Sequence, residues 1–196
     1  MASYSVRRLE HHDLPTRVAW FNHPMVSSQI MLDAPVSLAS TERWFSETLF
    51  NSNRLDLAFE CSAYDRCQLV AMAGLAPIEH KHRRSEIYIV VDPMRTGQGF
   101  GTLALRWIVN YAFRDLDLNR LLLYTMGDNA RARRFYERNG FRAEGVLRAH
   151  ALHRGRLADR HIHALLHSDW QHMPWGAEEG PHIGHTCHEF DIPGEE

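Results

Sequence analysis

The feature that most constrains the fold of this chain is a strand that ends in a glycine-rich turn and leads directly into a long amphipathic helix. Residues Glu86–Val91 are mostly β-branched or aromatic and are soon followed by Pro93, which predicts a buried strand. Alternate glycines come next, at Gly97, Gly99 and Gly101. Apolar residues with helical spacing then follow, at Leu105, Ile108, Val109, Ala112, Phe113 and Leu116. Such a turn points unpaired backbone N–H groups at the space above the helix N-terminus, so it predicts a phosphate site.

The spacing of these glycines narrows the choice of phosphate ligand. A P-loop needs a lysine after its last glycine, and none follows Gly101. A dinucleotide-binding turn needs Gly-x-Gly-x-x-Gly, whereas this chain has Gly97-x-Gly99-x-Gly101. The tighter spacing suits a loop that wraps one pyrophosphate, as in coenzyme A binding.

A second motif lies downstream of the glycine turn. Residues 120–126 predict another strand, and Asp128-Asn129 then opens a short helix that stops at Gly140. The sequence Asn129-x-x-Ala132-x-x-Phe135-Tyr136-x-x-x-Gly140-Phe141 resembles the signature of the GNAT superfamily of acetyl-CoA-dependent N-acetyltransferases. The resemblance runs from about residue 85 to residue 169. It is strongest to the branch with ribosomal-protein N-terminal, spermidine and amino-sugar acetyltransferases.

The predicted elements and the resemblance agree on an α/β fold. Strands and helices are expected in the order βααβββαβαββ, which corresponds to a single GNAT-like domain with a mixed, mostly antiparallel central sheet flanked by helices. We expect this domain to span residues 1–169. Residues 170–196 lack periodicity and are interpreted as a C-terminal tail or a packed extension.

The resemblance implies that acetyl-CoA is the co-substrate and that the two motifs hold it. Backbone N–H groups of the glycine turn would bind the pyrophosphate, and the end of the preceding strand would lie beside the pantetheine. The cofactor-binding residues expected on this basis are Val91, Thr96, Gly97, Gln98, Gly99, Gly101, Thr102 and Asn129. Thr96 stands where the family usually has glutamine or arginine, and Arg95 is one residue early. Whether an arginine of this turn contacts phosphate is therefore left open.

Two residues are candidates for proton transfer. Tyr136 would act as the general acid toward the departing sulfur, and its alternative role is packing beside Phe135. Glu86 would act as the general base, and its alternative role is an ion pair with a neighbouring arginine at position 83 or 84. Two histidines at positions 80 and 82 rank lower as bases because they lie in a polar loop.

The predicted function is an acetyl-CoA-dependent N-acetyltransferase in which a primary amine attacks the thioester directly within a ternary complex. The acceptor remains open between a protein N-terminus, a polyamine, an aminoglycoside and an amino sugar. Asp56, Glu60 and Asp65 give a weak indication of a polyamine or aminoglycoside site, and Trp20, Asn22, Trp44 and His150 are candidate acceptor contacts. A non-catalytic module that binds coenzyme A as a sensor or scaffold is the alternative from another class.

The composition indicates which partners, cellular location and metal content to expect. The formal net charge of −2 implies no nucleic acid or anionic membrane partner, and no apolar run reaches the length of a membrane span. Three irregularly spaced cysteines favour a reduced, cytoplasmic protein, and a homodimer is compatible with the sequence. The histidines around His182-x-x-His185-x-Cys187-His188 have the density of a zinc site, but they lie in the aperiodic tail, so no metal is expected.

Overall fold

Eight strands form one sheet, in the spatial order β6-β7-β5-β4-β3-β2-β1-β8. The computed structural model describes residues 2–32, 35–63, 66–176 and 184–190, and the side chains of 3–32, 35–62 and 67–176. The strands are β1 Ala2–Arg8, β2 Leu55–Ala63, β3 Arg66–Glu79, β4 Arg84–Val91, β5 Arg120–Met126, β6 Arg142–His153, β7 Arg156–Leu166 and β8 Gly184–Phe190. All neighbouring pairs are antiparallel except β4 and β5, which run parallel. The sheet is therefore mixed and mostly antiparallel, as predicted.

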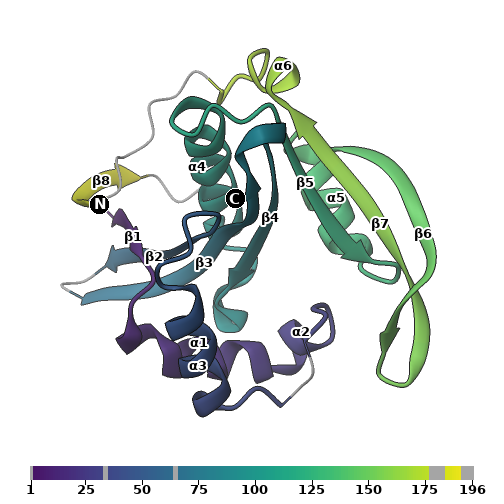
Figure 1. Ribbon diagram of the computed structural model, residues 1–196. Coiled ribbons are helices and arrows are strands. Elements are labelled where there is room, and N and C mark those ends of the chain that lie inside the picture. Colours follow the sequence, from purple (N-terminus) through teal and green to yellow (C-terminus); the bar gives the residue numbers. More distant parts are fainter. Residues whose placement is uncertain (1, 33–34, 64–65, 177–183, 191–196) are drawn as a thin grey trace.

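Helices cover both faces of the sheet (Figure 1). They are α1 Leu14–Asn22, α2 Pro24–Ser27, α3 Leu38–Thr48, α4 Phe100–Arg114, α5 Ala130–Arg138 and α6 His167–Trp170. One face packs on α4 and α5, and its core includes Ile87 of β4. The other face packs on α1 and α3, and its core includes Val90. The residues along β4 thus alternate between the two faces, as expected of a strand buried on both sides.

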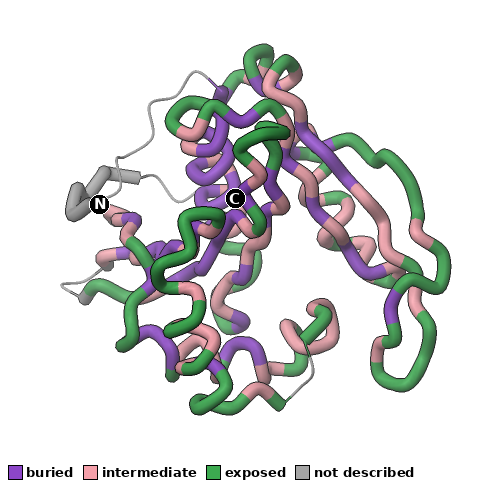
Figure 2. The backbone as a smooth tube through the Cα atoms, viewed as in Figure 1, coloured by how far each residue is buried: buried purple, intermediate pink, exposed green. Residues whose placement is uncertain are grey.

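The parallel pair β4 and β5 separates along its length. Hydrogen-bonded pairing joins Arg84–Glu86 to Arg120–Leu122 and goes no further. Beyond these residues the two strands diverge, and the gap between them opens toward α2 (Figure 1). The apolar core continues on either side of the gap, through β2 to β4 and through β5 and β7 (Figure 2). The hydrogen-bonded pairing therefore stops partway along these two strands, in the middle of the sheet.

The predicted elements occur in the predicted order, and the structure adds α2 after α1 and α6 and β8 after β7. The apolar stripe of α4 is buried, apart from its last member, Leu116, which packs at the edge of the core. β6 begins at Arg142, directly after the Asn129–Phe141 signature. Thr41 is the buried residue of α3, whereas Leu49 follows the last helical residue and its side chain is 53% exposed.

The segment after β7 packs against the domain. Trp170 is buried and donates from Nε1 to Asn110 Oδ1 of α4 at 2.7 Å, and Trp175 is buried as well. Farther on, β8 pairs with β1. The expected division at residue 169 stays a prediction, because residues on both sides of it share one core.

Candidate active site

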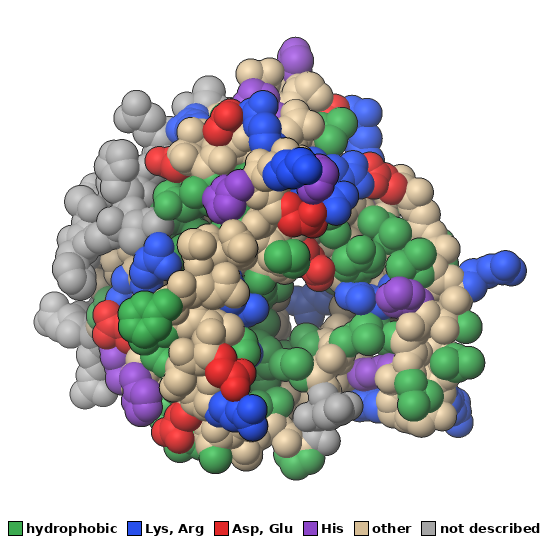
Figure 3. Space-filling model, viewed as in Figure 1, with side chains coloured by type: hydrophobic (Ala, Val, Ile, Leu, Met, Phe, Trp, Pro, Cys, Tyr) green, Lys and Arg blue, Asp and Glu red, His purple; other side chains and the backbone are tan. Residues whose placement is uncertain are grey.

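A large cleft of about 1400 Å³ occupies the gap between β4 and β5. It extends from the turn before α4 to the surfaces of α1, α2 and α3. Figure 3 shows the molecule hollowed at this place, with Lys and Arg side chains in and around the hollow. We call the part lined by the turn, α4 and α5 the loop side, and the part facing α1, α2 and α3 the helical side.

The turn before α4 has the geometry of an anion site. Gly97 and Gly99 have φ of 91° and 84°, a left-handed conformation in which a side chain is strained. The first helical bond of α4 runs from Leu103 N–H to Gly99 O at 3.0 Å. The N–H groups of Phe100, Gly101 and Thr102 thus have no acceptor within the part of the chain that the structure describes, as at any open helix N-terminus. The turn therefore offers several donors to one phosphate group.

All but one of the predicted cofactor-binding residues line the cleft. The cleft is lined by Val91, Thr96, Gly97, Gly99, Gly101, Thr102 and Asn129. Gln98 is exposed and does not line it, because the turn points this side chain to solvent. Asn129 caps α5, with Oδ1 accepting from Ala132 N–H at 2.9 Å, so its side chain stands at the open end of that helix.

Three arginines on the loop side were missed by the sequence analysis. Arg106, Arg131 and Arg138 line the cleft and bring positive charge to the side that carries the open N–H groups. The arginine in the turn behaves differently: Arg95 pairs with Gln68 and with Asp92 and is not among the lining residues. Arg134, also considered for phosphate contact, is exposed outside the cleft. Helical spacing of arginines on α5 did not reveal which of them turn inward.

Tyr136 packs against its aromatic neighbours, and it also stands where an acid could meet a ligand in the cleft. Its ring packs edge-on against Phe135 at 5.1 Å and Phe141 at 5.6 Å between centroids, and it also lines the cleft. Burial raises the pKa of the phenol to about 12. The hydroxyl is therefore protonated throughout the neutral range and is available as a donor.

Glu86 lies on the helical side, half-buried in the cleft lining. The ion pairs considered for it do not form, since Arg83 bonds to Asp117 and Arg84 to Glu79. Burial raises the pKa of the Glu86 carboxyl, and the nearby charge of Arg160 opposes that rise. The competing candidates His80 and His82 are exposed on a turn and do not line the cleft.

A row of three residues crosses the sheet beneath the helical side. Asp56 on β2 pairs with Gly74 on β3, and Gly74 pairs with Tyr88 on β4. The Tyr88 hydroxyl donates to Asp56 across the glycine, and burial raises the pKa of that phenol well above its ordinary value. A Cβ at Gly74 would lie 2.3 Å from Tyr88 Cε1, so the row depends on a glycine at its centre.

Two arginines surround this row. Arg54 forms a bidentate pair with Asp56, at 2.6 Å from Nε and 2.9 Å from Nη2. The guanidinium of Arg17 lies over the rings of Trp44 and Phe21, at 4.0 and 4.1 Å from the centroids. Both arginines and Trp44 line the cleft.

The other residues expected on the acceptor side have structural roles. Trp20 is in the core, and Asn22 bonds both ways with the backbone of Val36 at 2.7 Å. His150 is exposed on β6 outside the cleft. The expected carboxylate cluster does not form: Asp56 is held by Arg54, Glu60 pairs with Arg7, and Asp65 lies outside the described residues.

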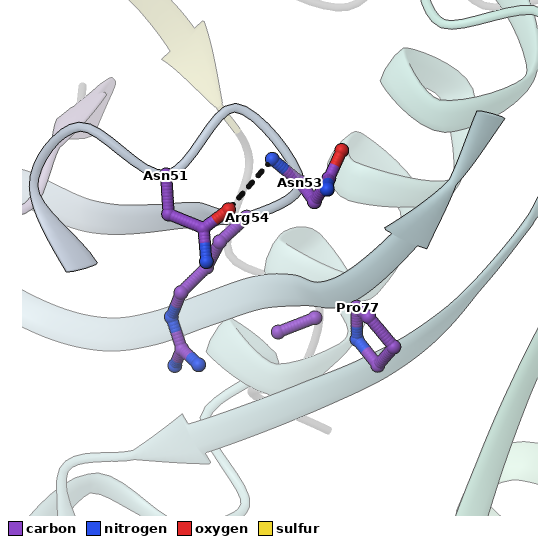
Figure 4. A pocket seen from close by; sticks show the side chains of 5 residues that line it. Asn51, Asn53, Arg54 and Pro77 are labelled. Carbon is purple, nitrogen blue, oxygen red and sulfur yellow. Dashed lines mark hydrogen bonds between the residues drawn. The ribbon is translucent and has the colours of Figure 1, made fainter.

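A second, smaller pocket of about 380 Å³ adjoins the row from the β2–β3 side and shares Arg54 with the cleft. Figure 4 shows Arg54 beside Asn51, Asn53 and Pro77, with the side chain of Asn51 accepting from Asn53 N–H. Its one charged side chain is already paired with Asp56. The pocket therefore adds no further titratable group to the site.

Within the described side chains, no group of three or more His, Cys, Asp or Glu residues is arranged to hold a metal. His182 and the side chains of His185, Cys187 and His188 lie outside the described residues. None of the helices in the described segments is both long and apolar enough to cross a membrane.

Comparison with known families gives a match over most of the chain. Residues 5–142 match the model of the acetyltransferase (GNAT) domain. The uncharacterized N-acetyltransferase YoaA of Bacillus subtilis is 29% identical over 102 residues, which cover 52% of this chain and 58% of that protein. The spermidine N(1)-acetyltransferase of Escherichia coli K12 is 26% identical over 145 residues, 74% of this chain and 76% of the relative.

Among solved structures, the fold is similar to that of spermidine N-acetyltransferase from Vibrio cholerae in complex with CoA and spermine. The TM-score is 0.79 at 24% identity, and the alignment covers 85% of this chain and 96% of that one. At this identity the likeness extends to the fold, including the sheet that carries the cleft.

Proposed function

The chain belongs to the GNAT family of acetyltransferases and is an acetyl-CoA-dependent N-acetyltransferase, and we propose that its acceptor is a primary amine that enters from the helical side of the cleft. The family assignment rests on the match over residues 5–142. The positions of donor and acceptor are inferred from this chain's own residues.

One observation carries the proposal: a cleft through the sheet joins an anion-binding turn to a carboxylate and a phenol. The turn and the three arginines of the loop side suit the phosphates of acetyl-CoA, and Val91 lines the way from there into the sheet. Bound at the turn, acetyl-CoA supplies the acetyl group as a thioester. Glu86 on the helical side and Tyr136 on the loop side both line this cleft.

The proposed chemistry needs two proton movements. Glu86 takes a proton from the attacking amine, either directly or through water, as the C–N bond forms and the C–S bond breaks. Tyr136 donates its proton to the sulfur that receives the electron pair of the broken C–S bond, so coenzyme A leaves as the free thiol, and the phenol then regains a proton from solvent. A pKa of about 12 keeps Tyr136 protonated in every resting enzyme molecule at neutral pH, which is the form that the step uses.

The spermidine acetyltransferases among the relatives make a polyamine a candidate acceptor. The charges of this cleft do not favour it. On the helical side, Glu86 is the single carboxylate that lines the cleft within the described chain, whereas Arg17 and Arg160 line it as cations, and Arg54 lines it already paired with Asp56. A polycation would meet more like charge than opposite charge.

The test is release of free thiol from acetyl-CoA, measured against a panel of polyamines, aminoglycosides, amino sugars and N-terminal peptides. Turnover with one class identifies the acceptor. Acetyl-CoA binding without any turnover would favour the sensor role, and absence of binding would contradict the proposed donor site.

Two further properties remain proposals. A homodimer is supported by exposed leucines of the β6–β7 hairpin, Leu152 and Leu157, which pair across the strands and are 72% and 69% exposed. Light scattering in solution tests it. A cytoplasmic location is proposed from the sparse cysteines and is tested by fractionation of cells that express the protein.

A further inference from the structure

The helical side of the cleft carries an excess of positive charge that the proposed reaction does not use. Glu86 has a use as the proposed general base, and Arg160 lies close enough to lower the pKa of its carboxyl. Arg54 is neutralised by its bidentate pair with Asp56. Arg17 is left without a use in catalysis, although it stands in the cleft lining.

Arg17 is held in place and yet has open donors. Stacking over Trp44 and Phe21 fixes its guanidinium plane, and this contact joins α1 to α3. No carboxylate of the described chain lies within ion-pair distance of Arg17, and none of its side-chain nitrogens makes a hydrogen bond there. An arginine keeps its charge at neutral pH even where burial lowers its pKa, as it does here. The result is a positioned, partly buried cation facing a cleft.

The nearby carboxylate is not free to neutralise Arg17. Asp56 already accepts both donors of the Arg54 fork and the hydroxyl of Tyr88. Its charge reaches Arg17 through space without a direct contact. The Asp56–Gly74–Tyr88 row therefore binds Arg54 and leaves Arg17 without a carboxylate partner in the described chain.

Arg160 adds to the same imbalance. It lies over the ring of Tyr124 at 4.3 Å, and its buried Nε has no hydrogen-bond partner within the described residues. Its β7 position pairs with Met126 of β5, which lines the cleft. Two stacked arginines thus face one carboxylate across the helical side.

From this arrangement we propose that the acceptor amine carries an anionic group, a carboxylate or a phosphate, which Arg17 binds while the amine meets Glu86. The inference rests on the proposed acetyl transfer for its choice of ligand. The guanidinium fork matches the geometry of either anion. Apolar residues between the two ends, among them Phe21, Val26 and Ile30, would contact the body of the acceptor.

The sheet sets the spacing between amine and anion. Glu86 and Tyr88 share one face of β4, and a strand rises about 3.3 Å per residue, so they lie about 7 Å apart along it. Arg17 and Arg54 both lie over the ring of Trp44, and Arg54 also lies 6.0 Å from the centroid of the Tyr88 ring, which places Arg17 toward the Tyr88 end of this stretch of β4. An acceptor with several bonds between amine and anion suits this arrangement.

The experiment compares amines in matched pairs that differ by the anion alone. For the carboxylate the pair is 6-aminohexanoate and hexylamine, and for the phosphate it is glucosamine 6-phosphate and glucosamine, with spermidine as the polycation. Thiol release from acetyl-CoA gives kcat/KM for each. The wild-type chain should prefer the anionic member of at least one pair by about 10-fold to 100-fold, the usual strength of charge-assisted hydrogen bonds.

The variant R17Q should lose that preference through a rise in KM for the anionic member. Arg43 provides a matched control, because it is an exposed arginine on α3 that pairs with Glu47 outside the cleft. R43Q should keep the wild-type preference. The proposal would be overturned if the neutral members and spermidine had kcat/KM values equal to or above those of the anionic members, and if R17Q left the ratios of these values unchanged. The acetyltransferase assignment would then remain intact.

Calorimetry on the CoA-loaded protein separates the two proposals. The anionic members should bind more tightly than their neutral partners, and R17Q should remove the difference, whether or not turnover occurs. Binding preference without turnover would support the anion site and contradict the reaction. If neither anionic member binds more tightly than its partner, the anion site is refuted.

Discussion

Replacing Gly74 by alanine tests whether the residue row beneath the helical side is as tightly built as its geometry indicates. The new methyl carbon would lie 2.3 Å from Tyr88 Cε1 and 2.5 Å from the carbonyl oxygen of Leu55. Carbon atoms in contact normally stay about 3.5–4.0 Å apart. Tyr88 and β2 therefore have to move by more than 1 Å, roughly, relative to β3.

The cost can be assembled from three contributions. Overpacking a core costs about 1–3 kcal/mol. Displacing Tyr88 removes its hydrogen bond to the buried Asp56, and a bond to a charged group contributes about 1.5–3 kcal/mol. Alanine restricts the unfolded chain and returns about 0.4–1 kcal/mol. We expect Gly74→Ala to lower the free energy of unfolding by about 2–5 kcal/mol.

Urea denaturation of the wild type and variant measures this difference. In a thermal melt, each kcal/mol corresponds to about 2–4 °C for a chain of this size. Gly145 on β6 gives the matched control, because a Cβ there meets nothing within 4 Å. Gly145→Ala should stay within about 0.5 kcal/mol of the wild type. A Gly74→Ala variant as stable as Gly145→Ala would refute the close contact between Tyr88 and β3.

Three other predictions concern the cleft. Gly99→Ala places a side chain at φ of 84°, which costs about 1–2 kcal/mol. The affinity for acetyl-CoA, measured by calorimetry, should therefore fall about 5- to 30-fold. An unchanged affinity would contradict the role of the turn. Glu86→Gln removes the proposed base and should lower kcat by about 100-fold or more, with acetyl-CoA binding retained; wild-type kcat would exclude Glu86. Arg160→Gln removes a charge that lowers the pKa of Glu86, and because the base works deprotonated, the acidic limb of kcat/KM should move to higher pH. A limb that stays in place would separate Arg160 from Glu86.

The two motifs allowed much of the fold and the donor side to be predicted. The glycine turn, the α4 stripe and the Asn129–Phe141 signature are continuous segments, so residue order alone conveys their geometry. The same is true of Tyr136, which stands within the signature and lines the cleft. The inward turn of Arg106, Arg131 and Arg138 depended on how α4 and α5 sit against the sheet, which residue order does not specify.

The helical side could not be derived in the same way. Asp56, Gly74 and Tyr88 are brought into one row by strand register, and register is set by the whole sheet. The packing of α1 on α3 places Arg17 near that row. The proximity of Asp56, Glu60 and Asp65 along the chain was misleading, because Asp56 and Glu60 are held by different arginines.

The measurement that tests the central claim most directly is acetyl-CoA turnover by the wild type and by Tyr136→Phe with the best amine of the panel. The variant keeps the ring packed on Phe135 and Phe141 and loses only the hydroxyl. We predict that kcat falls by about 100-fold or more while the affinity for acetyl-CoA stays the same, because the hydroxyl acts on the departing sulfur. Equal kcat in the two proteins would contradict the assignment of Tyr136 as the acid and, with it, the proposed arrangement of the site.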